Sequence, residues 1–212
     1  MKNKTSSMVA VIGDLVGSRQ QPSRSQAQAA LLDALAVANE RVPALQPLES
    51  TIGDEFQGVY DSVESAATAV LLVRLALPEK MDCRAGIGRG PIEIVGRSRY
   101  GLTQDGPAWW SARDAIVDVK EGERRLPGLR TTVAEGDAWM NSYLMTRDAI
   151  VTGFDGRQRR LALGVLQGST RAELARIEGI SASAVSQSLR RSGASAVLES
   201  VGVLTAPTEV DR

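Results

Sequence analysis

The chain has 212 residues, of which 43% are hydrophobic and 24% charged, a composition typical of a globular protein with one good core and a small appended module. Its 25 basic and 25 acidic residues balance, which excludes a whole-molecule field that attracts a polyanion, so any affinity for nucleic acid has to come from local charge asymmetry. The absence of histidine excludes the most common general base and every Ser-His or Cys-His catalytic pair, and the single cysteine excludes an internal disulfide.

The sequence contains no stretch typical of a membrane span. The longest apolar run, residues 66–77, includes Arg74 and is too short to cross a bilayer. The first seven residues are polar, and Asp14 interrupts the apolar stretch that follows them, which is not typical of a signal peptide. We therefore expect a cytoplasmic protein with no membrane partner. Cys83 lies in an apolar run and is interpreted as a buried strand thiol.

The first two thirds of the chain alternate short apolar runs with stretches of helical periodicity. Gly86, Gly88 and Gly90 predict a place where another backbone approaches closely. The predicted elements, in chain order, are a buried strand at 8–12, a helix at 23–39, a hairpin of strands at 48–52 and 56–60, a helix at 62–77, a long strand or strand pair at 83–95, a helix at 109–117, and a strand at 131–133 followed by a helix.

This order of elements predicts an α+β fold in which helices and a mixed sheet form an α/β sandwich. Turn-forming residues gather at 153–156, and the pattern after them is entirely helical. We therefore predict two domains, an α/β domain over residues 1–152 and a small all-α domain over residues 153–212. The polar tail from Thr205 onward is expected to be frayed.

The C-terminal region carries the signals of two short helices joined by a tight turn. Thr170 and Glu173 form a capping box that starts the first helix. Gly179 provides the left-handed residue that the turn needs, and Ser181 caps the second helix. The apolar residues that seat the second helix against the first are Ile180, Val185 and Leu189.

Over about twenty residues, this region resembles the helix-turn-helix of bacterial regulators. It departs from the pattern at Glu178, where an apolar residue is usual, and we expect Ile177 to supply that contact. The resemblance implies that the second helix enters the major groove of double-stranded DNA, where Gln pairs with adenine and Arg with guanine. The predicted DNA-binding residues are Ser183, Ser186, Gln187, Arg190 and Arg191.

Local charge agrees with this interpretation. Residues 157–191 contain seven arginines against two acids, Glu173 and Glu178, which suits phosphate contacts that weaken with salt. Helix-turn-helix proteins usually bind as dimers, so a homodimer is expected. The alternative is a three-helix module that serves only for dimerisation or docking.

Two carboxylate motifs stand out in the N-terminal domain. Asp14 ends a predicted strand, and Asp54 and Glu55 lie at the tip of the hairpin. Carboxylates on neighbouring strands can hold Mg²⁺, which takes oxygen ligands and keeps substrate phosphates in its shell, so these three residues are the predicted metal ligands. Residues of the adjoining turns offer phosphate contacts to a nucleotide ligand, and the predicted set is Gly17, Ser18, Arg19 and Gly53. Alternatively, Gly-Asp forms an ordinary hairpin turn, and an acid after a strand caps the next helix.

Three segments resemble catalytic families. Residues 14–17 and 84–90 are similar to motifs of class III nucleotidyl cyclases, and residues 52–56 resemble both the cyclase hairpin and the GGDEF motif of diguanylate cyclases. The resemblance implies a ferredoxin-like sandwich in which Asp14 and Asp54 bind a metal pair that positions a nucleoside triphosphate. Ser50 stands where many cyclases select the base, Trp110 replaces their transition-state Asn, and Arg113 falls one residue early, so no catalytic residue is assigned.

Together with residues 105–108, residues 112–113 and the helix-turn-helix, these motifs are similar over nearly the full chain to the SatD family of bacterial proteins. The resemblance implies an architecture more than an activity. Our leading hypothesis is a DNA-binding transcriptional regulator whose cyclase-like domain senses a nucleotide or a metal. The alternatives are an enzyme of Mg²⁺-dependent nucleotidyl or phosphoryl transfer that uses Asp14 and Asp54, and a non-catalytic interaction module.

Overall fold

The centre of the fold is a five-stranded mixed sheet with the order β2-β3-β1-β4-β7. The computed structural model describes residues 7–17, 23–51, 53–98, 101–134 and 137–206, with the backbone alone at 97, 98 and 101–103. The strands of this sheet are β1 (Met8–Val16), β2 (Gln46–Ser50), β3 (Glu55–Tyr60), β4 (Asp82–Gly90) and β7 (Thr131–Val133). Strands β4 and β7 are parallel and the other neighbours antiparallel, which confirms the predicted mixed sheet.

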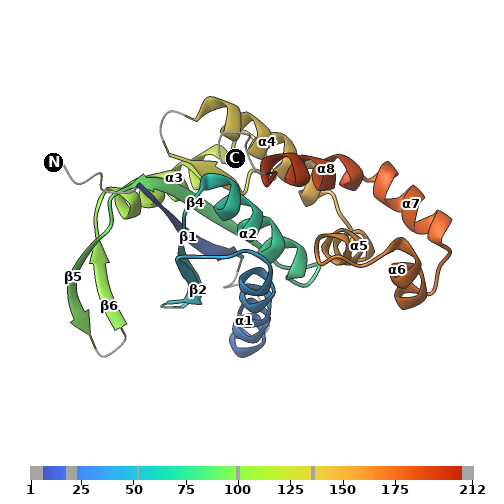
Figure 1. Cartoon of the computed structure of the whole chain (residues 1–212), viewed down its shortest axis with the longest axis horizontal. Coiled ribbons are helices and arrows are strands. Elements are labelled where there is room, and N and C mark those ends of the chain that lie inside the picture. Colours follow the sequence, from blue (N-terminus) through green and yellow to red (C-terminus); the bar gives the residue numbers. More distant parts are fainter. Residues whose placement is uncertain (1–6, 18–22, 52, 99–100, 135–136, 207–212) are drawn as a thin grey trace.

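Helices cover both faces of the sheet (Figure 1). On one face, Val9 and Val11 of β1 share a core with α1 (Arg24–Arg41) and α2 (Val63–Ala76). On the other face, Ala10 and Ile12 pack against α3 (Pro107–Gly122). Successive residues of β1 thus face opposite helical layers, and both are apolar because both layers are occupied.

Helix α3 lies directly against the backbone of β4. A Cβ atom added at Gly86 would overlap the backbone at Ala112 and Ile116, and one added at Gly88 would overlap the backbone at Ala108 and Ala112. The predicted close approach at these glycines is therefore confirmed. Small residues on both elements bring α3 close enough to place its side chains beside the sheet.

The segment predicted at 83–95 is divided between two sheets. Strand β4 ends at Gly90, and β5 (Glu93–Ser98) pairs with β6 (Gly101–Asp105) in a separate hairpin that projects from the body of the molecule (Figure 1). The helix predicted at 109–117 spans Pro107–Gly122. It begins with Pro107, whose missing N–H costs nothing in the first turn of a helix.

Five helices follow β7 in the described part of the chain. They are α4 (Ala138–Thr152), α5 (Gly156–Leu166), α6 (Arg171–Glu178), α7 (Ala182–Arg191) and α8 (Ala194–Leu204). Helices α5 to α8 share an apolar core that also includes Leu71 and Leu75 of α2. In Figure 1 these helices extend to the end of the molecule opposite the β5–β6 hairpin. Within the described ranges, no helix has the length and apolar character needed to cross a bilayer.

We expect the Gly86→Ala substitution to lower the free energy of unfolding by about 3 kcal/mol, because the methyl group meets helix backbone that cannot move aside. The matched control is Gly202→Ala in α8, where an added Cβ has open space, and we expect it to raise that free energy by about 0.5–1 kcal/mol. Urea denaturation measures both. Equal stabilities of the two variants would contradict the close packing of α3 on β4.

Candidate functional site

A cleft of about 920 Å³ lies at the end of β1, and we call it the Asp14 cleft. It brings together the three predicted metal ligands and two of the predicted phosphate-binding glycines, since Asp14 pairs with Glu55 in the β1–β3 register. The predicted residues in its lining are Asp14, Gly17, Gly53, Asp54 and Glu55. The predicted residues Ser18 and Arg19 lie outside the described residues.

Two cations hold the carboxylate of Asp14. Arg84 lies opposite Asp14 in the β1–β4 register, and its Nε donates to Asp14 Oδ1 at 2.7 Å. Lys120, delivered by the last turn of α3, has its Nζ 2.8 Å from Asp14 Oδ2. Asp14 is buried, so this pairing offsets the cost of keeping its charge away from water.

The ion pairs of Asp14 bear on the predicted Mg²⁺ site. A divalent cation at Asp14 has to compete with Arg84 and Lys120, which each contact one oxygen of its carboxylate. Among the described residues, no three carboxylate, histidine or cysteine side chains are placed to hold a metal ion together. The cleft combines its three acidic residues with three cations, Arg24, Arg84 and Lys120, so the formal charges of its lining balance and suit a polar ligand.

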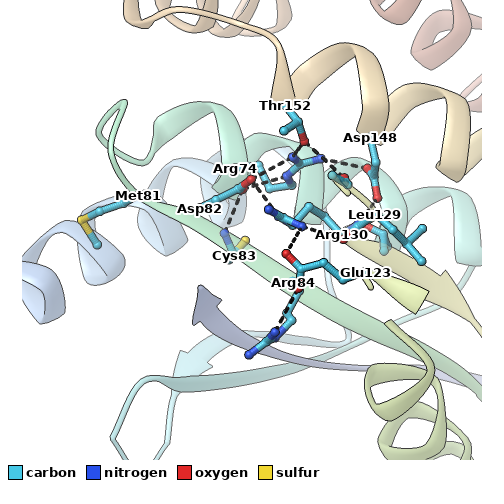
Figure 2. A network of polar contacts seen from close by, with 12 residues as sticks. Arg74, Met81, Asp82, Cys83, Arg84, Glu123, Leu129, Arg130, Asp148 and Thr152 are labelled. Atoms are coloured by element: carbon cyan, nitrogen blue, oxygen red, sulfur yellow. Dashed lines mark hydrogen bonds and ion pairs between the residues drawn. The ribbon is translucent and has the colours of Figure 1, made fainter. Parts of the chain in front are cut away.

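From the Asp14 cleft, a chain of ion pairs leads into the interior (Figure 2). Arg84 Nη1 lies 3.3 Å from Glu123 Oε2, and the other oxygen of Glu123 accepts from Arg130 Nη1 at 2.7 Å. Arg130 Nε in turn donates to Asp82 Oδ2 at 3.0 Å. Positive and negative side chains therefore alternate from the end of β1 to the start of β4.

The inner end of this chain is fully buried. Arg74 of α2 donates from Nε to Asp82 Oδ1 and from Nη1 to Asp148 Oδ1, both at 2.9 Å, and neither Arg74 nor Asp148 is exposed to solvent. Asp148 also accepts from Arg147 Nη2 and from the backbone N–H of Arg130, both at 2.8 Å. Burial alone raises the pKa of Asp82, but Arg74 and Arg130 outweigh it and hold that pKa below its usual value. Burial likewise raises the pKa of Cys83, the expected buried strand thiol.

The second candidate site is the surface of α6 and α7. The predicted capping box is present, since Thr170 N–H donates to Glu173 Oε2 at 2.7 Å and Glu173 N–H donates to Thr170 Oγ1 at 3.2 Å. Gly179 ends α6 in the left-handed region, with φ 66°, and the hydroxyl of Ser181 caps α7. These local contacts set the short turn between the two helices.

Helix α7, which follows this turn, is amphipathic. Val185 and Leu189 are buried against the core that α5 to α8 share. The predicted DNA-binding residues lie away from that core, with Ser186 half-buried and the others exposed, namely Ser183, Gln187, Arg190 and Arg191. The Ser186 hydroxyl accepts from Arg171 Nη1 at 3.1 Å, which joins the start of α6 to the middle of α7.

The prediction that Ile177 supplies the usual apolar contact is wrong. Its side chain is 64% exposed, and the neighbouring Glu178 is the residue that turns inward. Arg160 holds Glu178 through two hydrogen bonds of 2.7 and 2.8 Å, and Arg157 lies 3.6 Å from the same carboxylate. A polar residue therefore replaces the usual apolar contact because α5 supplies two guanidinium groups to meet it.

The arginines of this region are not all available on its exposed surface. Arg159 is buried, where its Nη1 donates to the carbonyl oxygen of Met81 at 2.8 Å, and burial lowers its pKa. With Arg157 and Arg160 facing Glu178, the exposed arginines that remain are Arg171 and Arg176 of α6 and Arg190 and Arg191 of α7.

Comparison with known proteins places the chain in a family. The SatD family model matches residues 8–202. The chain belongs to the SatD family. A search of the curated proteins found no significant match. Among solved structures, the SatD chain is similar to the monomeric guanylyl cyclase domain of the RhoGC fusion protein from the aquatic fungus Blastocladiella emersonii, with 18% identity, a TM-score of 0.40, and coverage of 53% of this chain and 75% of that chain.

We expect Asp82→Asn to lower the free energy of unfolding of the SatD chain by about 3 kcal/mol at pH 7, because Arg74 and Arg130 each lose one of their two carboxylate partners and keep only Asp148 and Glu123, respectively. The folded-state pKa of Asp82 is lowered, so its stabilisation is present above the unfolded value of 3.8 and is lost as the pH falls below it. Urea denaturation from pH 7 to pH 3 should therefore show the free energies of unfolding of the wild type and of Asp82→Asn converging. Asp33→Asn, an exposed substitution in α1, is the control, and a constant difference across this range would contradict the assignment.

Proposed function

We propose that this SatD-family chain is a cytoplasmic, homodimeric transcriptional regulator that binds double-stranded DNA through α6 and α7, with an N-terminal domain that binds a small ligand such as a nucleotide. The observation that carries the proposal is the division of α7, which buries Val185 and Leu189 and leaves Gln187, Arg190 and Arg191 exposed. A helix used only for packing has no need of a basic, amide-bearing outer face.

The exposed side chains suit the chemistry of the major groove. Gln187 can pair with adenine through its amide, and Arg190 can pair with guanine through its fork of donors. Arg171 and Arg191 flank this face and suit phosphate contacts, which position a protein without reading the sequence. Together these groups supply both base contacts and phosphate contacts on one side of α7.

The place of the two helices also favours the proposal. Helices α6 and α7 pack against α5, α8 and each other, and they lie at the end of the molecule away from the β5–β6 hairpin (Figure 1). A duplex can approach this end without meeting the sheet. In a homodimer, two copies of α7 would read half-sites one helical turn of DNA apart.

We expect the Arg190→Ala/Arg191→Ala double variant to bind duplex DNA at least about tenfold more weakly at low salt, with a slope of log K against log salt reduced by about 2, because two phosphate or base contacts are lost. Fluorescence anisotropy with a labelled duplex library measures both quantities. The control is Arg124→Ala/Arg125→Ala, which removes the same charge from an exposed segment after α3. The proposal fails if both double variants bind like the wild type, or if the wild type does not bind duplex DNA.

The Asp14 cleft bears on the competing hypothesis of Mg²⁺-dependent transfer. Asp14 and Asp54 do line one cleft, but a metal at Asp14 would have to compete with the ion pairs to Arg84 and Lys120. We therefore favour ligand binding over catalysis and expect each nucleoside triphosphate to remain intact on incubation with the protein and Mg²⁺ or Mn²⁺, as followed by ion-exchange chromatography. A product that disappears in the Asp54→Asn variant would instead establish a transferase.

A further inference from the structure

A second cleft, of about 930 Å³, lies between α3 and β2 on the face of the sheet that α3 covers only in part. We call it the tryptophan cleft. Its floor is formed by β1 and β3 and includes Ile12, Gln57 and Gly58. One wall carries Trp109 and Trp110 of α3, and the other carries Leu45 and the first two residues of β2, Gln46 and Pro47. None of these residues lies on α6 or α7, so the cleft is independent of the proposed DNA-binding surface.

The walls of the tryptophan cleft present apolar surface to solvent. Trp110 is 58% exposed and Leu45 is 57% exposed, and both line the same cleft. The indole of Trp110 is held in place, since its Nε1 donates to Asp105 Oδ1 at 2.6 Å. Trp109 beside it is half-buried and packs against the core between α3 and β1. The cleft therefore offers a fixed aromatic surface before any ligand arrives, which lowers the entropic cost of binding.

Three side-chain amides supply polar groups to the same cleft. Gln46, Gln57 and Gln104 all line it, and within the described part of the chain their amide groups make no hydrogen bond. Each amide has both a donor and an acceptor, which is the pattern that the edge of a nucleobase presents. Charged side chains are few, with Arg113 against Glu49 and Asp114, so the lining carries a small net negative charge.

We propose that the tryptophan cleft binds the base of a nucleoside or nucleotide, with the ring stacked on Trp110 and its polar edge paired with the glutamine amides. Stacking on an aromatic side chain and pairing of an exposed base edge are the two contacts by which proteins recognise unpaired bases. The net negative lining disfavours a single-stranded nucleic acid, whose binding grooves are cationic. The occupant is therefore a single base rather than a polynucleotide.

The two clefts of the sheet domain meet at one ion pair. Arg113 lines the tryptophan cleft, Glu55 lines the Asp14 cleft, and the two side chains are 3.3 Å apart. Arg113 is the cation at this boundary that the phosphates of a nucleotide would meet if its base lay on Trp110, whereas a nucleoside would use the tryptophan cleft alone. Comparing nucleosides with nucleotides thus separates the two contributions.

The test is a titration followed by tryptophan fluorescence. The chain has three tryptophans, and Trp139 is 89% exposed outside the cleft, so the titrations use the Trp139→Phe background to remove its signal. Adenosine, guanosine, cytidine, uridine and their 5′-monophosphates are the probes. We expect saturable quenching by at least one purine nucleoside, because purines stack over the largest area. Adding Trp110→Ala should weaken binding about tenfold or more, as followed by calorimetry, and Gln57→Ala should weaken it and change the base preference.

Several outcomes would overturn the inference. The inference is wrong if no nucleoside or nucleotide saturates the protein at millimolar concentration. It is also wrong if ribose 5-phosphate, which has no base, binds equally well. Undiminished affinity in both Trp110→Ala and Gln57→Ala, or loss only in Lys120→Ala, would place the ligand elsewhere. Binding of a single-stranded oligonucleotide without nucleoside binding would identify a different partner. Because Trp110 is largely exposed, its variant should melt at the wild-type temperature. Neither result bears on the proposed binding of duplex DNA by α7.

Discussion

A fully buried guanidinium organises this molecule. Arg74 has no contact with water, so the structure depends on meeting its charge with carboxylates from two other elements, Asp82 of β4 and Asp148 of α4. The carbonyl oxygen of Arg74 also lies 3.4 Å from Arg159 of α5. Helix α2 therefore connects the sheet to the helices that follow it, by polar contacts at Arg74 and by apolar ones at Leu71 and Leu75.

Features that depend on neighbours in the sequence were the predictable ones. The hairpin around residues 53–55, the Thr170–Glu173 capping box and the left-handed Gly179 are decided within a few residues, and the structure has them where they were expected. The ion pairs of Arg74 were not predictable in this way, because Asp148 is 74 residues distant and carries no local signal. The position of Arg74 between apolar residues of α2 was the one local indication of a buried partner.

The candidate site shows the same limit. Pairing of β1 with β3 follows from the pattern of strands, so the gathering of Asp14 and Glu55 at one place could be predicted. The side chains that neutralise Asp14 come from β4 and α3, and only the register of β4 and the close packing of α3 bring Arg84 and Lys120 within reach. The cations that pair with Asp14 were therefore not evident from the segments that carry the acids.

The core that α2 shares with the C-terminal helices has a practical consequence for dissecting the protein. A fragment that stops near Thr152 keeps every strand that the structure describes, yet it uncovers Leu71 and Leu75, which are almost fully buried in the whole chain. It also leaves the carbonyl oxygen of Met81 without the guanidinium of Arg159. Such a truncation exposes an apolar surface that promotes aggregation. Insolubility of the fragment therefore says nothing about whether the sheet folds.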